Sequence, residues 1–176
     1  MLDAPPALGQ RVQRCMNERE SLRMSASNLP FAGKLAPAAS AEWAGWYQWT
    51  GVDPFEDAVG PFFVKRDEQG IVTGFRPGPA NRNGHGSIHG GCMMTFADFS
   101  LFMIAGAGGE EVSGVTVTFN CEFVGAAMPG QLLEARGDVI RAGRSLIFVR
   151  GLIAADGEAA LSFSGTIKRS KTTSAH

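Results

Sequence analysis

One segment constrains the fold more than any other part of the chain. Residues 92–105 (CMMTFADFSLFMIA) carry a single charged residue, Asp98, and would be apolar on nearly every side of a helix. They lack strand alternation and end at Gly106, a residue type typical of helix C-termini. Because a helix that is apolar all round must be surrounded by protein, we expect residues 92–105 to form a central, buried helix.

The sequence after this helix predicts β-strands. Apolar and polar residues alternate with the two-residue period of half-buried strands, and turns separate the segments, including the strong hairpin turn Asp156-Gly157. A hairpin around Asp67–Gly70 precedes the helix. The predicted strands are residues 62–66, 71–75, 115–123, 132–140, 145–155 and 161–167. We therefore predict an α+β fold, a curved antiparallel sheet wrapped around one long helix, with the last four strands forming a meander.

The chain divides into an N-terminal extension (1–58), a main domain (59–170) and a C-terminal tail (171–176). Mixed charges and spaced apolar residues over 10–24 predict a short amphipathic helix. Four aromatic residues follow: Trp43, Trp46, Tyr47 and Trp49. Because exposed tryptophans are unusual, we expect them to pack onto the main domain; the alternative is a lid over a ligand.

Composition excludes several classes of protein. The 176 residues carry a formal net charge of -1, so no basic surface for nucleic acid is indicated. The three cysteines, Cys15, Cys92 and Cys121, form no Cys-x-x-Cys pair, which favours free thiols in a reducing compartment. No signal peptide or run of eighteen apolar residues is evident, so we expect a cytoplasmic protein that does not enter a membrane.

The informative motif lies at the start of the predicted helix: Asn83, then His89-Gly90-Gly91, then Asp98 nine residues after the histidine. Over roughly residues 60–169 the chain resembles the hotdog-fold acyl-CoA thioesterases of the phenylacetate-pathway (PaaI-like) type. The resemblance implies a hotdog fold and hydrolysis of an acyl-CoA thioester without a cofactor. It also implies a homo-oligomer whose active sites are shared between subunits.

Elementary chemistry supports the same site. The N-terminus of a helix presents unpaired N–H groups and partial positive charge. Gly90 and Gly91 would let a thioester carbonyl approach those groups, as an oxyanion site requires. Burial of the lone Asp98 would raise its pKa toward that of a general base.

Distance adds a constraint on the assembly. Eight residues separate Gly90 from Asp98, about 12 Å along a helix, so one helix cannot bring both to one carbonyl. Two antiparallel helices of a two-fold dimer could. We expect an obligate homodimer, with pairing into a dimer of dimers left open.

The resemblance also implies roles for single residues. Asp98 acts as general base or as nucleophile, and the Gly90 N–H stabilises the oxyanion with help from His89. The Asn83 amide helps to position the nucleophile or the carbonyl, and the Thr116 hydroxyl holds the water. The candidate groups for substrate binding are Gly91 and, for the CoA phosphates, Arg141, Arg144 and Ser145. Ser87 is expected only to cap the helix.

Simpler interpretations stand beside these. Asp98 could pair inside the core, His89 could only pack, Asn83 is a common turn residue, and Arg141 and Arg144 could be solvated. His85, His89 and Cys92 lack an evident fourth ligand for zinc.

Two other functions are open to a protein of this fold. The alternative to hydrolysis is a non-catalytic protein that binds acyl-CoA or an acyl carrier; a hotdog dehydratase would need Asp and His together. Met93, Met94 and Phe96, with the N-terminal tryptophans, suggest an apolar or aromatic acyl pocket.

Overall fold

A computed structural model of the protein describes residues 28–109 and 111–170. The helix predicted over 10–24 and the tail 171–176 lie outside these residues. One eight-stranded antiparallel sheet has the order β1-β2-β3-β4-β6-β7-β8-β5. The strands are β1 (Leu35–Pro37), β2 (Tyr47–Trp49), β3 (Phe63–Asp67), β4 (Gly70–Phe75), β5 (Gly114–Phe123), β6 (Leu133–Ala142), β7 (Leu146–Ala155) and β8 (Glu158–Arg169). The helices are α2 (Pro54–Val59) and α3 (Gly90–Ala105), with short 3-10 turns at Ala32–Lys34, Ala41–Trp43 and Pro79–Asn81.

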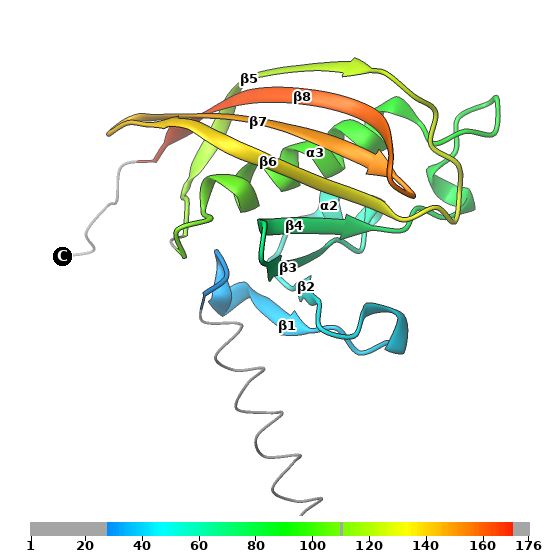
Figure 1. Cartoon of the computed structure of the whole chain (residues 1–176), viewed down its shortest axis with the longest axis horizontal. Coiled ribbons are helices and arrows are strands. Elements are labelled where there is room, and N and C mark those ends of the chain that lie inside the picture. The colour runs from blue at the N-terminus through cyan, green and yellow to red at the C-terminus, as the bar shows by residue number, and fades with distance from the viewer. Residues whose placement is uncertain (1–27, 110, 171–176) are drawn as a thin grey trace, which may run out of the picture.

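Helix α3 is the centre of the molecule. Strands β5, β8, β7 and β6 curve over it and β4 lies on its other side (Figure 1). Phe96 and Leu101 are fully buried, as an all-round apolar helix requires. The helix ends at Gly106, whose N–H donates to the Phe102 carbonyl. The predicted central helix and the curved antiparallel sheet are both confirmed.

The predicted meander of the last four strands is wrong in one respect. Only β6, β7 and β8 follow one another in space, because β5 pairs with β8 and not with β6. The connection 124–132 carries the chain across the end of the sheet, where the Ala127 carbonyl accepts the Ile88 N–H, and β6 then pairs with β4. Strand β5 therefore lies at an edge of the sheet.

The two predicted hairpins are confirmed. The Asp67 side chain accepts the Gln69 N–H in the β3–β4 turn. Asp156 and Gly157 have φ angles of 47° and 90°, the left-handed pair that a two-residue hairpin turn needs.

The aromatic residues of the N-terminal segment pack onto the main domain as expected, but Trp49 lies in a different place from Trp43 and Trp46. Trp43 stacks on Phe63 at 4.0 Å between ring centroids and meets Trp46 edge-on at 5.2 Å. Gly74 leaves room for these rings, since a Cβ there would lie 2.7 Å from both indoles. The other face of the β3–β4 hairpin packs on α3 through Phe62. Both faces of the hairpin are thus covered, and only Trp49 borders a cavity near α3.

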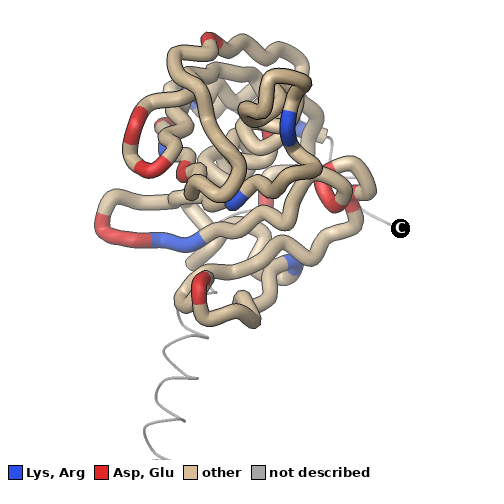
Figure 2. Tube along the Cα trace, turned by 90° about the vertical axis from the view of Figure 1, so that its right-hand side faces the viewer, with Lys and Arg blue, Asp and Glu red and all other residues tan. Residues whose placement is uncertain are grey.

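Charges of both signs are distributed along the trace (Figure 2). Within the described residues, no helix is both long enough and apolar enough to cross a membrane.

Candidate functional site

Asp98 is a half-buried acid on α3, held from the edge strand. The Thr116 hydroxyl on β5 donates to Asp98 Oδ1 at 2.7 Å. Burial raises the pKa of Asp98, the Thr116 hydrogen bond lowers it, and the nearby Asp53 raises it again. The structure thus brings together two of the predicted site residues. It leaves Asp98 harder to ionise than an ordinary aspartate, a property of a general base.

Two hollows adjoin Asp98, and both are also lined by Asp53 and Glu56. The first, of about 290 Å³, runs between the N-terminal segment and α3. Its other lining residues are Phe31, Lys34, Trp49, Phe99, Phe102, Met103, Glu111, Val112, Ser113 and Gly114. The second, of about 460 Å³, lies between α2, α3 and β5 and is further lined by Phe55, Met94, Thr95, Thr116 and Phe119. Volumes of this size fit a small organic group.

Asp53 and Glu56 are site residues that the sequence analysis missed. Asp53 caps α2, accepting the N–H groups of Phe55 and Glu56, and Pro54 occupies the first turn. Burial, then the charges of Asp53, Asp98 and Asp57, raise the pKa of Glu56 to about 7. The Asp-Pro cap signature could have predicted the short helix. The packing of α2 against α3 depends on tertiary contacts, and no local sequence pattern predicts it.

Backbone donors at the N-terminus of α3 are only partly paired. His89 is the N-cap residue, and its Nδ1 accepts the Gly91 N–H at 2.9 Å. Among the described residues, no acceptor takes the Gly90 N–H. The Gly90 Cα faces the ring of Phe123, which a Cβ would approach to 3.0 Å. Gly90, with its free N–H and no side chain, is therefore a group that can polarise a carbonyl here.

Asn83 lies in its own tight loop. Its Nδ2 donates to Ser87 Oγ at 2.8 Å, and its Oδ1 accepts the His85 N–H at 2.8 Å. The prediction that Ser87 caps the helix is wrong, because its hydroxyl is used by Asn83 and His89 takes the cap. Within one chain both ends of the Asn83 amide are engaged in the loop, as expected of a turn residue.

Gly90 and Asp98 stay apart within one chain. Both belong to the single continuous helix α3, so the axial separation of about 12 Å follows from helix geometry. Within one protomer, the Gly90 N–H and the Asp98 carboxylate therefore lie at separate positions along α3.

Arg141, Arg144 and Ser145 lie at the exposed β6–β7 turn. In the sheet register, Arg141 of β6 pairs with Phe148 of β7. Phe148 pairs in turn with Thr166 of β8, and Thr166 pairs with Thr118 of β5. Two strands thus separate these groups from β5, each step about 4.8 Å. Within one chain the structure does not bring them to Asp98.

Of the residues expected to line an acyl pocket, only some lie at the hollows beside Asp98. Met93 and Phe96 are buried in the main core and line neither hollow beside Asp98, whereas Met94 lines the second one. Trp43 and Trp46 belong to a separate cluster, because they pack on the other face of the β3–β4 hairpin.

Burial raises the pKa of the Cys92 thiol to about 11. Among the residues that the structure describes, no three His, Cys, Asp or Glu side chains could hold a metal ion together.

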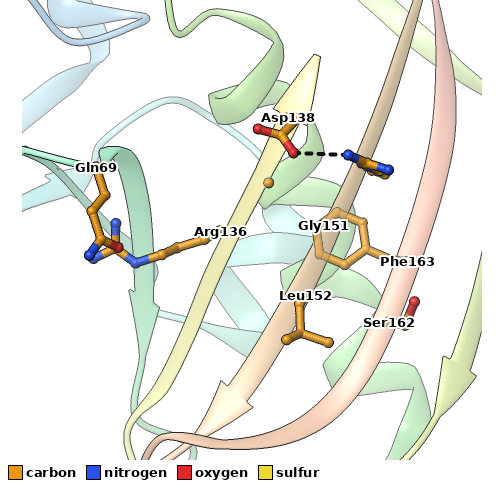
Figure 3. Close-up of a pocket in the computed structure, with 9 residues that line it drawn as sticks. Gln69, Arg136, Asp138, Gly151, Leu152, Ser162 and Phe163 are labelled. Carbon is orange, nitrogen blue, oxygen red and sulfur yellow. Dashed lines mark hydrogen bonds and ion pairs between the residues drawn. The ribbon is translucent and has the colours of Figure 1, made fainter. Parts of the chain in front are cut away.

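A third hollow, of about 490 Å³, lies on β6, β7 and β8 away from Asp98 (Figure 3). Its two arginines already have partners: Arg136 binds both oxygens of Asp67, and Arg150 lies 3.4 Å from Asp138. With both cations paired, this hollow offers no free charge to a ligand.

Comparison with known proteins indicates a family. The model of the thioesterase superfamily matches residues 85–161, which include His89, Asp98 and Thr116. A Pseudomonas aeruginosa protein named "Putative esterase PA0474" is 33% identical over 97 residues, covering 54% of this chain and 72% of that protein.

Solved structures agree on the fold. The E. coli PaaI protein from the phenylacetic acid degradation operon has a TM-score of 0.59 at 21% identity, covering 68% of this chain and 86% of the other. A hypothetical thioesterase from Streptococcus pneumoniae, crystallised with coenzyme A, has a TM-score of 0.55 at 19% identity, covering 62% and 88%. At such identities the likeness concerns the fold alone, and the predicted hotdog fold is confirmed.

Proposed function

The chain belongs to the thioesterase superfamily, and from this premise we propose that it hydrolyses acyl-CoA thioesters to a free acid and CoA. The observation that carries the proposal is the placement of Asp98. It is half-buried on α3, held by Thr116 at 2.7 Å, and lines two hollows beside it. A pure binding protein has no need of such an acid.

The proposed reaction uses the residues as follows. A water molecule attacks the thioester carbonyl while Asp98 takes one of its protons, which then passes to the departing CoA thiolate. In the other route Asp98 attacks directly, the CoA thiolate leaves and takes a proton from solvent, and water then hydrolyses the acyl-Asp98 anhydride to the free acid. The Gly90 N–H stabilises the negative charge that forms on the carbonyl oxygen. His89 holds the end of the helix in place, and the C–S bond then breaks to release CoA. Asn83 and Thr116 orient the water and the carboxylate, while Gly91, Arg141, Arg144 and Ser145 contact the CoA portion.

The proposed site needs two subunits. Because Gly90 and Asp98 lie about 12 Å apart along α3, each site takes Gly90 from one protomer and Asp98 from its partner. Strand β5 supports this arrangement: it is a sheet edge, and its Val115 and Val117 side chains are 59% and 48% exposed. An unpaired, apolar edge is suited to pairing with a second copy. A dimer of dimers remains part of the proposal.

We further propose a reducing, cytoplasmic location. The described thiols, Cys92 and Cys121, are both free, which suits such a compartment.

The test is thiol release from a panel of acyl-CoA thioesters, comparing the native chain with Asp98→Asn. We expect hydrolysis by the native chain and a loss of about a hundredfold or more in the variant, the usual effect of removing a general base. Asp138→Asn is the matched control, because Asp138 is an exposed acid on β6 that lines neither hollow beside Asp98. Equal rates for native chain and Asp98→Asn would refute the proposal. Tight binding of acyl-CoA without turnover would favour the non-catalytic binding protein instead.

A further inference from the structure

The hollows beside Asp98 combine apolar walls with an unbalanced set of acids. Phe99, Phe102 and Met103 of α3 face Phe31 and Trp49 of the N-terminal segment across the first hollow. If Asp98 acts at the thioester carbonyl, as the proposed function holds, an acyl chain extending from that carbon fits the apolar space next to Asp98. This inference rests on that function.

The charges around this space are mostly negative. In the first hollow the one basic group, Lys34, is paired with Glu111 at 2.5 Å. The second hollow is lined by Asp53, Glu56 and Asp98 and by no basic side chain. Among the described residues, the Glu56 carboxylate has no hydrogen bond or ion pair. Its charge is therefore uncompensated where an acyl chain would lie.

We propose that Glu56, supported by Asp53, makes the site select uncharged acyl groups and reject acyl groups that end in a carboxylate. A second carboxylate in this space would meet like charge in a poorly solvated cavity, which disfavours it by several-fold to a hundredfold. Trp49 supplies only a neutral indole N–H, buried and without an acceptor among the described residues, and one neutral donor does not balance two carboxylates.

The rejection should depend on pH. Glu56 faces Asp53 and Asp57 on and beside its own helix, Asp98 on α3, and the Lys34–Glu111 pair at the rim. Its pKa of about 7 means that it is mostly neutral at pH 6 and mostly ionised at pH 8. A carboxylated acyl chain stays ionised throughout this range, so discrimination should grow as pH rises.

The experiment compares kcat/KM for butyryl-CoA and succinyl-CoA, which share a four-carbon acyl chain, with enzyme-free hydrolysis subtracted. The ratio of the two values at each pH cancels the ionisation of Asp98, which both substrates share. We expect the native chain to prefer butyryl-CoA by about tenfold or more at pH 8, and this ratio to fall several-fold at pH 6. Glu56→Gln should lower the pH 8 ratio by about tenfold and remove most of its pH dependence.

Asp57→Asn is the matched control: it removes the same charge from the same helix, but Asp57 lines neither hollow beside Asp98. Its ratio should stay close to that of the native chain. A native ratio near one, a ratio that does not change with pH, or an unchanged ratio in Glu56→Gln would each overturn the inference. Should Glu56→Gln not fold, the pH dependence of the native chain decides. Absence of all hydrolysis would instead refute the proposed function. Asp98-dependent hydrolysis at equal rates for the two substrates would refute only this inference.

Discussion

Replacing Gly90 by proline removes one chemical group from the proposed site, the N–H at the first residue of α3. Proline is favoured at the first helical position because its fixed φ suits a helix and its missing N–H has no partner there. His89, the preceding residue, has φ −64° and ψ 135°, an extended conformation that residues before proline adopt. The helix should therefore form, and the change should act on chemistry.

The expected loss is large. Removal of one oxyanion donor costs about 10²–10³ in kcat, or roughly 3–4 kcal/mol of transition-state stabilisation. Gly90→Ala is the control because it keeps the N–H while adding the same Cβ. That Cβ would meet the Phe123 ring at 3.0 Å, and this ring, in a residue that is 53% exposed, can turn aside. Alanine should therefore cost much less activity than proline.

The assay is thiol release from an acyl-CoA that the native chain hydrolyses, with melting curves to show that both variants are folded. Subunit sharing is then tested by mixing Gly90→Pro with Asp98→Asn after dissociation. In a mixed dimer one site regains both groups, so two inactive proteins should recover about a quarter of native activity, since half the dimers are mixed and each has one intact site. Equal rates for the proline and alanine variants would refute the role of the N–H. No recovery in mixtures shown to contain mixed dimers would refute the shared site.

Three further predictions follow from the structure. Thr116→Val removes the 2.7 Å hydrogen bond to Asp98; the pKa of Asp98 should rise, so the acid limb of the kcat/KM profile should move to higher pH, with a loss of about tenfold near neutrality. Glu56 has its pKa raised to about 7, so it binds more protons folded than unfolded, and native stability should fall between about pH 4.5 and 7; Glu56→Gln should remove that fall, measured by urea unfolding at several pH values. Gly74→Ala would place a Cβ 2.7 Å from two indole rings and should cost about 1–3 kcal/mol of unfolding free energy; Gly78→Ala, with nothing within 4 Å, should change it by less than about 0.5 kcal/mol.

The sequence was sufficient wherever a pattern is local. The apolar run ending at Gly106 predicted α3, and the Asp156-Gly157 turn predicted the last hairpin. The place of β5 was not predictable in this way, because alternation along residues 114–123 shows that a strand is half-buried but not which strand lies beside it. The partner of β5 is set by contacts between distant parts of the chain, and the structure places β5 next to β8.

The candidate site likewise contains some residues that the sequence predicts and others that it does not. Asp98 was found because one acid in an apolar helix is conspicuous, and its contact with Thr116 is present. Asp53 and Glu56 looked like surface acids of a short helix, since nothing in residues 53–59 shows that α2 lies against α3. Trp43 and Trp49 carry the same side chain six residues apart, yet one packs on the outside of the hairpin and the other borders the cavity.

Because α3 carries both Gly90 and Asp98, helix geometry fixes the distance between them, and no side-chain substitution changes it. Inserting a single residue between them would lengthen this distance by about 1.5 Å and swing the carboxylate about 100° around the helix axis. Under the proposed mechanism, the loops and cavity walls can change with the acyl group they admit, whereas the eight-residue interval between Gly90 and Asp98 must keep its length.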